Sequence, residues 1–408
     1  MQKALILIAA CVFINIAESQ ENIFDSLLLR NTYTVGIENG LLTGTGGEFF
    51  KREAVGSQFI SLGEEHFTNE IPLFTTALFK TLQPAGFQYL ALENDPFGSQ
   101  LYSSKPYKGN RDSAIRLIQR YPFSVTFGSD QEVQMLADVS GLSKGKGRAI
   151  WGCDQAFGAT HALKELISFA PSNEAKEFTQ NLIDSAWRYE YSRDLDVRYM
   201  QTRSQAEVFE KLRDLYRPVS GSRALWLINS LISSSQLYRT FRTNEYQNNY
   251  EREEYMKTRF MEEYQYAHRR DGVLPKAVLK FGHWHIMNGF GPGSALTTGT
   301  FVRDLAKSNG LGTLTLQLLM WGKPGTRFEN LSKSTLYAPF LKNMSINDWT
   351  VIDLRPFRLF SKKIAMSGIF DTKQMDRFNQ LILQYDALLV FGSGTPYTSD
   401  WKKPGENE

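Results

Sequence analysis

The chain is poor in cysteine and histidine, and neither charge sign dominates. Two cysteines, Cys11 and Cys153, in 408 residues exclude a scaffold held together by disulfide bonds. With 46 basic and 43 acidic residues the net charge is only +3, and no basic stripe occurs, so we expect no nucleic-acid partner. Only five histidines are present, which leaves few candidates for acid–base catalysis.

Long apolar runs are also scarce. The first, Ala4 to Ala17, follows Lys3 and precedes small and polar residues, which predicts a secretory signal peptide at 1–19 and an exported protein, periplasmic or secreted. No segment approaches the roughly 20 apolar residues of a transmembrane span. A lipid anchor at Cys11 is the less favoured alternative, because the apolar run continues past that cysteine. If Cys11 is removed with the signal peptide, Cys153 has no cysteine partner, and we expect it to be a small buried apolar residue.

Short runs of β-branched and aromatic residues recur along the mature chain. Near-continuous apolar runs of this length are typical of strands buried on both faces, as in a parallel sheet covered by helices. A helical pattern with Leu73, Phe74 and Leu78 on one face, after a cap at Asn69, joins the first two runs in a βαβ unit. The predicted strands are residues 58–62, 89–92, 149–152, 277–281, 313–319, 350–354 and 387–391.

The middle of the chain lacks strand patterns and has strong helical periodicity instead. We therefore predict an α/β fold, with a mostly parallel sheet covered by helices and a large helical insertion at 156–271 that caps or flanks the sheet. The core halves are then 20–155 and 272–398, followed by a polar tail at 399–408. The aromatic side chains of Trp187, Tyr189 and Tyr191 are expected to contact a bulky substrate.

Unusual polar residues follow four of the predicted strands. They are Gly63-Glu-Glu-His66, Glu93-Asn-Asp95, Asp154-Gln155 and Gly282-His-Trp-His285. Because the carboxyl ends of parallel strands meet at one edge of a sheet, these groups are expected to share one site. His161 and His268 lie in helical segments and are interpreted as structural, and a glycine-rich stretch at 289–293 as a turn.

This set of groups suits two kinds of chemistry. A carboxylate beside a histidine fixes the tautomer of the ring and raises its basicity, as in a general base acting on water. A second histidine or an arginine across the cleft can stabilise an oxyanion. The same nitrogen and oxygen donors also suit zinc or manganese. No Gly-x-Ser-x-Gly elbow occurs, which counts against a serine hydrolase.

At these residues the sequence resembles the superfamily that joins erythromycin esterases, ChaN-like haem-binding lipoproteins and the Tiki/TraB proteins. The matching motifs stand in the family order and span roughly residues 58 to 300. They are Ile60-Ser-Leu-Gly-Glu-Glu-His66, Ala91-Leu-Glu93, Trp151-Gly-Cys-Asp154, Arg252-Glu-Glu-Tyr-Met256 and Lys280-Phe-Gly-His-Trp-His285.

The resemblance to the esterase branch implies a metal-free hydrolase. It implies His66 as the base that activates water, with an acidic partner at Glu64 or Glu65. The other implied site residues are Glu93, Arg252, His283 and His285. The spacing departs from the esterases, which carry one more residue between Glu and His in the first motif and His-Asn-x-His in the last. The tighter first motif is similar to the ChaN and Tiki branches, whereas the helical insertion and the Arg252 motif resemble the esterases.

The leading hypothesis is an exported hydrolase of a small-molecule ester or lactone, with no cofactor. His66, oriented by Glu65 or Glu93, would deprotonate water. His285 and Arg252 would stabilise the oxyanion. If only one of the late histidines enters the site, His285 is favoured over His283. A second hypothesis is a metal-dependent hydrolase or peptidase of the Tiki type, with His66, Glu93 and His285 as zinc or manganese ligands. The sequence is also compatible with a ChaN-like protein that binds haem or another ligand without catalysis, and with a family member without activity.

Overall fold

The computed structural model describes residues 23–105, 107–143, 147–191, 199–202, 206–219, 223–322, 331–342, 344–395 and 397–402. The predicted signal peptide and Cys11 lie outside these residues. Within them, no helix is long and apolar enough to cross a lipid bilayer.

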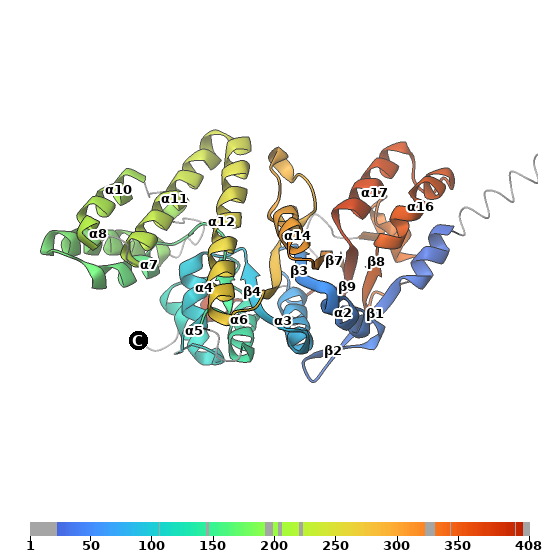
Figure 1. Cartoon of the computed structure of the whole chain (residues 1–408), viewed down its shortest axis with the longest axis horizontal. Coiled ribbons are helices and arrows are strands. Elements are labelled where there is room, and N and C mark those ends of the chain that lie inside the picture. The colour runs from blue at the N-terminus through green and yellow to red at the C-terminus, as the bar shows by residue number, and fades with distance from the viewer. Residues whose placement is uncertain are drawn as a thin grey trace, which may run out of the picture.

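Nine strands form one sheet, in the order β2-β1-β8-β9-β7-β3-β6-β4-β5 (Figure 1). All pairings from β9 to β5 are parallel, and β8, β1 and β2 extend one edge antiparallel. All seven predicted strands are present, which confirms the mostly parallel sheet, whereas β1 and β2 were not expected. The strands are β1 (Thr32–Glu38), β2 (Leu41–Thr43), β3 (Ser57–Glu64), β4 (Phe87–Leu92), β5 (Ile150–Gly152), β6 (Lys276–Gly282), β7 (Gly312–Gly322), β8 (Trp349–Asp353) and β9 (Ala387–Ser393).

Helices cover both faces of the sheet. Successive side chains of a strand point to opposite faces, so the buried strands place apolar side chains on both, and each face packs against helices. In β3, Ile60 belongs to the apolar core on one face, whereas Phe59 packs edge-on against Phe260 on the other face. One face carries α2 (Gly44–Gly56), α3 (Glu70–Leu82), α5 (Arg111–Arg120) and α6 (Asp130–Leu142). The other carries α12 (Glu245–Asp271) and α14 (Thr298–Ser308), with α16 (Arg355–Met366) and α17 (Thr372–Gln384) near the antiparallel edge.

The helix predicted between the first two strands is α3, with two local differences. Phe74 and Leu78 are buried as expected, but Leu73 is 53% exposed, because the apolar face is narrower than the sequence pattern. Asn69 occupies the cap position without a capping hydrogen bond, and its side chain donates to Thr395 instead.

Every regular element described between residues 156 and 271 is a helix, which confirms the helical insertion. The insertion has its own apolar core, built around residues such as Phe209, Leu227 and Leu231. Figure 1 shows its green helices projecting beyond the sheet, while the long helix α12 returns along it. These helices are α7 (Thr160–Leu166), α8 (Asn173–Glu190), α9 (Tyr199–Thr202), α10 (Ala206–Leu215), α11 (Arg223–Thr243) and α12; shorter helices in the sheet connections are α4 (Pro96–Ser103), α13 (His283–Ile286) and α15 (Ala338–Leu341).

Candidate active site

The four polar motifs meet at one edge of the sheet. Their strands are neighbours in the order β3-β6-β4-β5, and all three pairings are parallel, so their carboxyl ends point the same way. Glu64 is the last residue of β3, Glu93 follows β4, Asp154 follows β5 by two residues, and His283 follows β6. Glu64 and His283, more than 200 positions apart in the sequence, therefore lie at the same edge of the sheet.

Glu93 lies between the two imidazoles. Its Oε2 accepts a hydrogen bond from the backbone N–H of Gly282 at 2.7 Å and lies 3.7 Å from Nε2 of His66. Its Oε1 lies 3.7 Å from Nε2 of His285 and accepts from Nη2 of Arg252 at 2.6 Å. Burial acts to raise the pKa of Glu93, but the charges of His285 and Arg252 outweigh it and hold that pKa well below its ordinary value. Glu93 is therefore an ionised carboxylate.

Arg252 reaches this edge from α12 and ties the insertion to the sheet. Its Nη2 and Nε donate to the two carboxylate oxygens of Asp154, at 2.6 and 3.0 Å. Nε also donates to Oε1 of Gln155 at 3.1 Å, and Nη1 donates to Nε2 of His285 at 3.0 Å. This paired geometry fixes the plane of the guanidinium group.

The ring of His285 is held from both sides. Its Nδ1 lies 2.6 Å from Oε1 of Glu253, whose other oxygen accepts from the N–H and hydroxyl of Thr298. Because an arginine can only donate, Nε2 accepts from Arg252 and Nδ1 carries the proton. Burial acts to lower the pKa of His285, but the negative charges of Glu253 and Glu93 and the hydrogen bond to Glu253 together raise that pKa above its ordinary value.

His66 is oriented by a carboxylate and by an aromatic ring. Its Nδ1 lies 3.1 Å from Oε1 of Glu64, and its ring stacks on Phe127 with the centroids 3.7 Å apart. Glu64 also accepts from the buried Lys280 at 2.8 Å. Burial acts to raise the pKa of Glu64, but the charges of Lys280 and His66 lower it. The ionised Glu64 accepts a hydrogen bond from the N–H at Nδ1 of His66. The lone pair of the ring is therefore on Nε2, which faces Glu93.

The other predicted residues are placed around this centre. Glu65 is half-buried, and its charge, together with the larger effect of burial, raises the pKa of Tyr337 to about 12. His283 turns away from Arg252: its Nδ1 lies 3.4 Å from the backbone oxygen of Glu64, and burial lowers its pKa. Of the late histidines, His285 is thus the one that contacts Arg252.

The residues interpreted as structural lie outside this centre. His161 is buried in an ion pair with Asp95 at 3.1 Å, and His268 faces the backbone oxygen of Val273. Cys153 is fully buried, and its pKa is raised by burial, as expected of an apolar packing residue. The glycine stretch at 289–293 forms the predicted turn.

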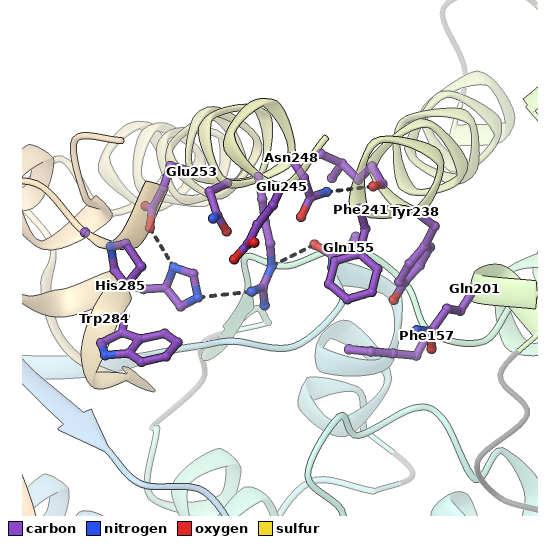
Figure 2. A pocket seen from close by; sticks show the side chains of 15 residues that line it. Gln155, Phe157, Gln201, Tyr238, Phe241, Glu245, Asn248, Glu253, Trp284 and His285 are labelled. Atoms are coloured by element: carbon purple, nitrogen blue, oxygen red, sulfur yellow. Dashed lines mark hydrogen bonds and ion pairs between the residues drawn. The ribbon is translucent and has the colours of Figure 1, made fainter. Parts of the chain in front are cut away.

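A cavity of about 350 Å³ opens beside Arg252 and His285, between α11, α12 and α13 (Figure 2). The rings that line it are Phe157, Tyr238, Phe241 and Trp284. None of the three aromatic residues expected to contact a substrate, Trp187, Tyr189 and Tyr191, lines this cavity. Tyr189 packs against the core of the insertion, whereas Trp187 and Tyr191 stack on each other and Tyr191 is exposed.

Two residues of the site, Glu253 and Lys280, were not among the expected site residues, although Glu253 directly follows Arg252 in its motif and Lys280 begins the last motif. Gln155 was expected at the site as the neighbour of Asp154, but without a role. Nothing in the motifs indicated that Glu253 orients His285 or that Lys280 holds Glu64.

The described side chains fit a metal ion poorly. Among them, no group of three or more histidine, cysteine, aspartate or glutamate side chains is arranged to hold one. The two nitrogens of His285 are occupied by Glu253 and Arg252, so a metal at Nε2 would have to displace a positively charged guanidinium group.

No family model matches the chain, and no curated protein matches it. Solved structures do match. A mutant of the erythromycin esterase EreC in its open conformation is 14% identical, with a TM-score of 0.52, over 86% of this chain and 94% of that one. A Bacillus cereus protein and a succinoglycan biosynthesis protein, 12% and 16% identical, each have a TM-score of 0.58 over 93% of this chain and 98% of theirs. The TM-scores show a shared fold, and at identities this low the similarity shows the fold alone. The chain therefore has the fold of erythromycin esterase that its motifs predicted.

Proposed function

We propose that the protein is a hydrolase of the erythromycin esterase-like type that cleaves an ester or lactone in a small-molecule substrate. The observation that carries this proposal is the position of Glu93, whose two oxygens face His66 on one side and the Arg252–His285 pair on the other. A base for water and a cationic group for an oxyanion then lie on opposite sides of one ionised carboxylate.

His66 is the proposed base. Its Nε2 takes a proton from a water molecule, and the oxygen of that water bonds to the carbonyl carbon of the substrate. Glu64 at Nδ1 and Glu93 near Nε2 stabilise the imidazolium that forms. When the tetrahedral intermediate collapses, the bond from carbon to the leaving oxygen breaks, and the imidazolium returns the proton to that oxygen.

Arg252 is the proposed partner of the oxyanion. One hydrogen on its Nη1 has no acceptor among the described residues, and Arg252 lines the cavity. His285 holds this guanidinium group in place, because its Nε2 accepts a hydrogen bond from Nη1. The developing negative charge therefore meets a cationic group that the protein already holds in position.

The base assignment is tested by His66→Ala, with His268→Ala as the control for loss of a histidine outside the site. We expect His66→Ala to fold and to lower kcat on a substrate of the wild-type protein by two or more orders of magnitude. An unchanged kcat would contradict the assignment. His268→Ala should hydrolyse that substrate at the wild-type rate.

The metal-dependent alternative is tested on the same purified protein. Activity measured with and without a chelator, together with elemental analysis, separates it from the proposed mechanism. We expect activity to survive the chelator, because Arg252 occupies Nε2 of His285. The haem-binding alternative stays a prediction, and titration with haemin tests it.

We also propose that the protein is exported after cleavage near residue 19. Sequencing the N-terminus of the mature protein tests this: a start near Gln20 supports it, and a lipid-modified Cys11 supports the anchored alternative.

A further inference from the structure

The side chain of Gln155 is buried and yet borders the cavity. It lies three residues after β5 and is only 7% exposed. Its amide touches the same cavity as Arg252 and His285, and Figure 2 shows its oxygen facing the guanidinium group. The function proposed above gives this residue no role.

The hydrogen bond to Arg252 fixes which way the amide points. Nε of Arg252 lies 3.1 Å from Oε1 of Gln155, and an arginine has no acceptor, so the oxygen must face Arg252. The amide NH₂ therefore points away from Arg252. Among the described residues it has no hydrogen-bond acceptor. Because Gln155 lines the cavity, a ligand that enters the cavity can supply the acceptor for this NH₂.

A second donor lies beside it. Nε and Nη2 of Arg252 are committed to Asp154, Gln155 and Glu93, and one hydrogen of Nη1 is committed to His285. The other Nη1 hydrogen has no acceptor among the residues that the structure describes. Two N–H donors, on side chains joined by a hydrogen bond, thus border one cavity.

We propose that Nε2 of Gln155 and Nη1 of Arg252 together form the oxyanion hole of the protein. Its ligand is the carbonyl oxygen of the substrate as it becomes a tetrahedral oxyanion, and the carboxylate product or a phosphonate fits the same donors. Gln155 is then a catalytic residue that touches the reacting oxygen. This inference rests on the proposed hydrolase function, but the binding of an anion to the hole does not require turnover.

Two substitutions isolate the donor. Gln155→Glu keeps the size of the side chain and the acceptor for Arg252 but replaces the NH₂ with an oxygen, and Gln155→Ala removes the group without adding charge. Gln180→Ala is the matched control, since Gln180 is an exposed glutamine of α8 and lies outside the cavity lining. Circular dichroism establishes that each variant is folded.

Binding of phenylphosphonate, measured by titration calorimetry, is the first readout. We expect both Gln155 variants to bind it at least ten-fold more weakly than the wild type, while Gln180→Ala binds it normally. On a hydrolysed ester, both should lower kcat by about 10²-fold with little change in KM, because the oxyanion forms only in the transition state.

The two proposals fail differently. If the folded Gln155 variants bind phenylphosphonate as the wild type does, or if the wild type does not bind it, the oxyanion hole is wrong. If binding depends on Gln155 but no ester is hydrolysed, the anion site stands and the hydrolase proposal fails. If hydrolysis depends on His66 but the Gln155 variants keep the wild-type kcat, the hydrolase proposal stands without this residue.

Discussion

Nη2 of Arg252 and Oε1 of Glu93 lie 2.6 Å apart, in an ion pair that joins the helical insertion to the carboxyl end of β4. Glu93 is buried and the side chain of Arg252 is 19% exposed, so the pair is largely shielded from water. The insertion therefore contributes a side chain to the centre of the site as well as a wall of the cavity.

Removing the charge of Glu93 should damage both activity and stability. Glu93→Gln keeps the shape of the side chain but leaves Arg252 without one of its two carboxylate partners. We expect kcat to fall about 10²-fold or more, and the free energy of unfolding to fall by up to roughly 3–5 kcal/mol, as when one partner of a buried pair is removed. Ester hydrolysis and urea denaturation measure the two effects. Glu254→Gln, on the exposed side of α12, is the control, and an equal loss in that variant would contradict the interpretation.

A methyl group at position 282 should disturb the site without unfolding the sheet. A Cβ on Gly282 would lie 3.1 Å from both Oε2 of Glu93 and Nε2 of His66. The backbone there has φ −52°, which alanine adopts, so the strain falls on the two side chains. We expect Gly282→Ala to lower kcat about ten-fold with a nearly unchanged melting temperature. Gly56→Ala, where a Cβ meets nothing within 4 Å, should change neither quantity.

The buried pair of His161 and Asp95 should make stability depend on pH. Burial acts to lower the pKa of His161, but the charge of Asp95, helped by Glu190 and Glu165, raises it above its ordinary value. The stabilisation is therefore fully present below about pH 6.5, the ordinary pKa of histidine, and is lost as pH rises through the folded-state pKa.

His161→Gln tests that dependence. The difference in free energy of unfolding between wild type and variant should be larger at pH 6 than at pH 9, as measured by urea denaturation at both values. A constant difference would mean that His161 stabilises the fold through packing alone. His268→Gln, which changes an exposed ring, controls for the loss of an imidazole.

The cavity rings should select substrates by size. Phe241 is 56% exposed and Trp284 is 51% exposed, although both line the cavity, so each presents apolar surface for a ligand to cover. We expect Phe241→Ala to raise KM several-fold for a bulky ester and to leave KM for an acetyl ester nearly unchanged. Leu359→Ala, at an exposed leucine of α16, should alter neither KM.

Strand prediction succeeded where strands are buried on both faces and failed at the sheet edge. Every residue of β3 is buried, so its sequence is a recognisable apolar run. β1 is largely half-exposed and β2 has three residues, so neither produces such a run. The same limit applies to Leu73, since a periodic pattern shows the apolar face of a helix but not how much of that face the neighbouring elements cover.

The parallel sheet, the helical insertion and the four polar strand ends could be predicted from the sequence, because burial on both faces and helical periodicity are local patterns along the chain. Which polar residue enters the site depends on the three-dimensional packing. Glu64 contacts Nδ1 of His66 because consecutive residues at the end of a strand point to opposite sides, which directs Glu64 and Glu65 differently. His285 meets Arg252 because the chain turns into the short helix α13, where residues two apart point in nearly opposite directions, and His283 is turned away. Such directions depend on where a strand ends and what packs against it, which no motif spacing specifies.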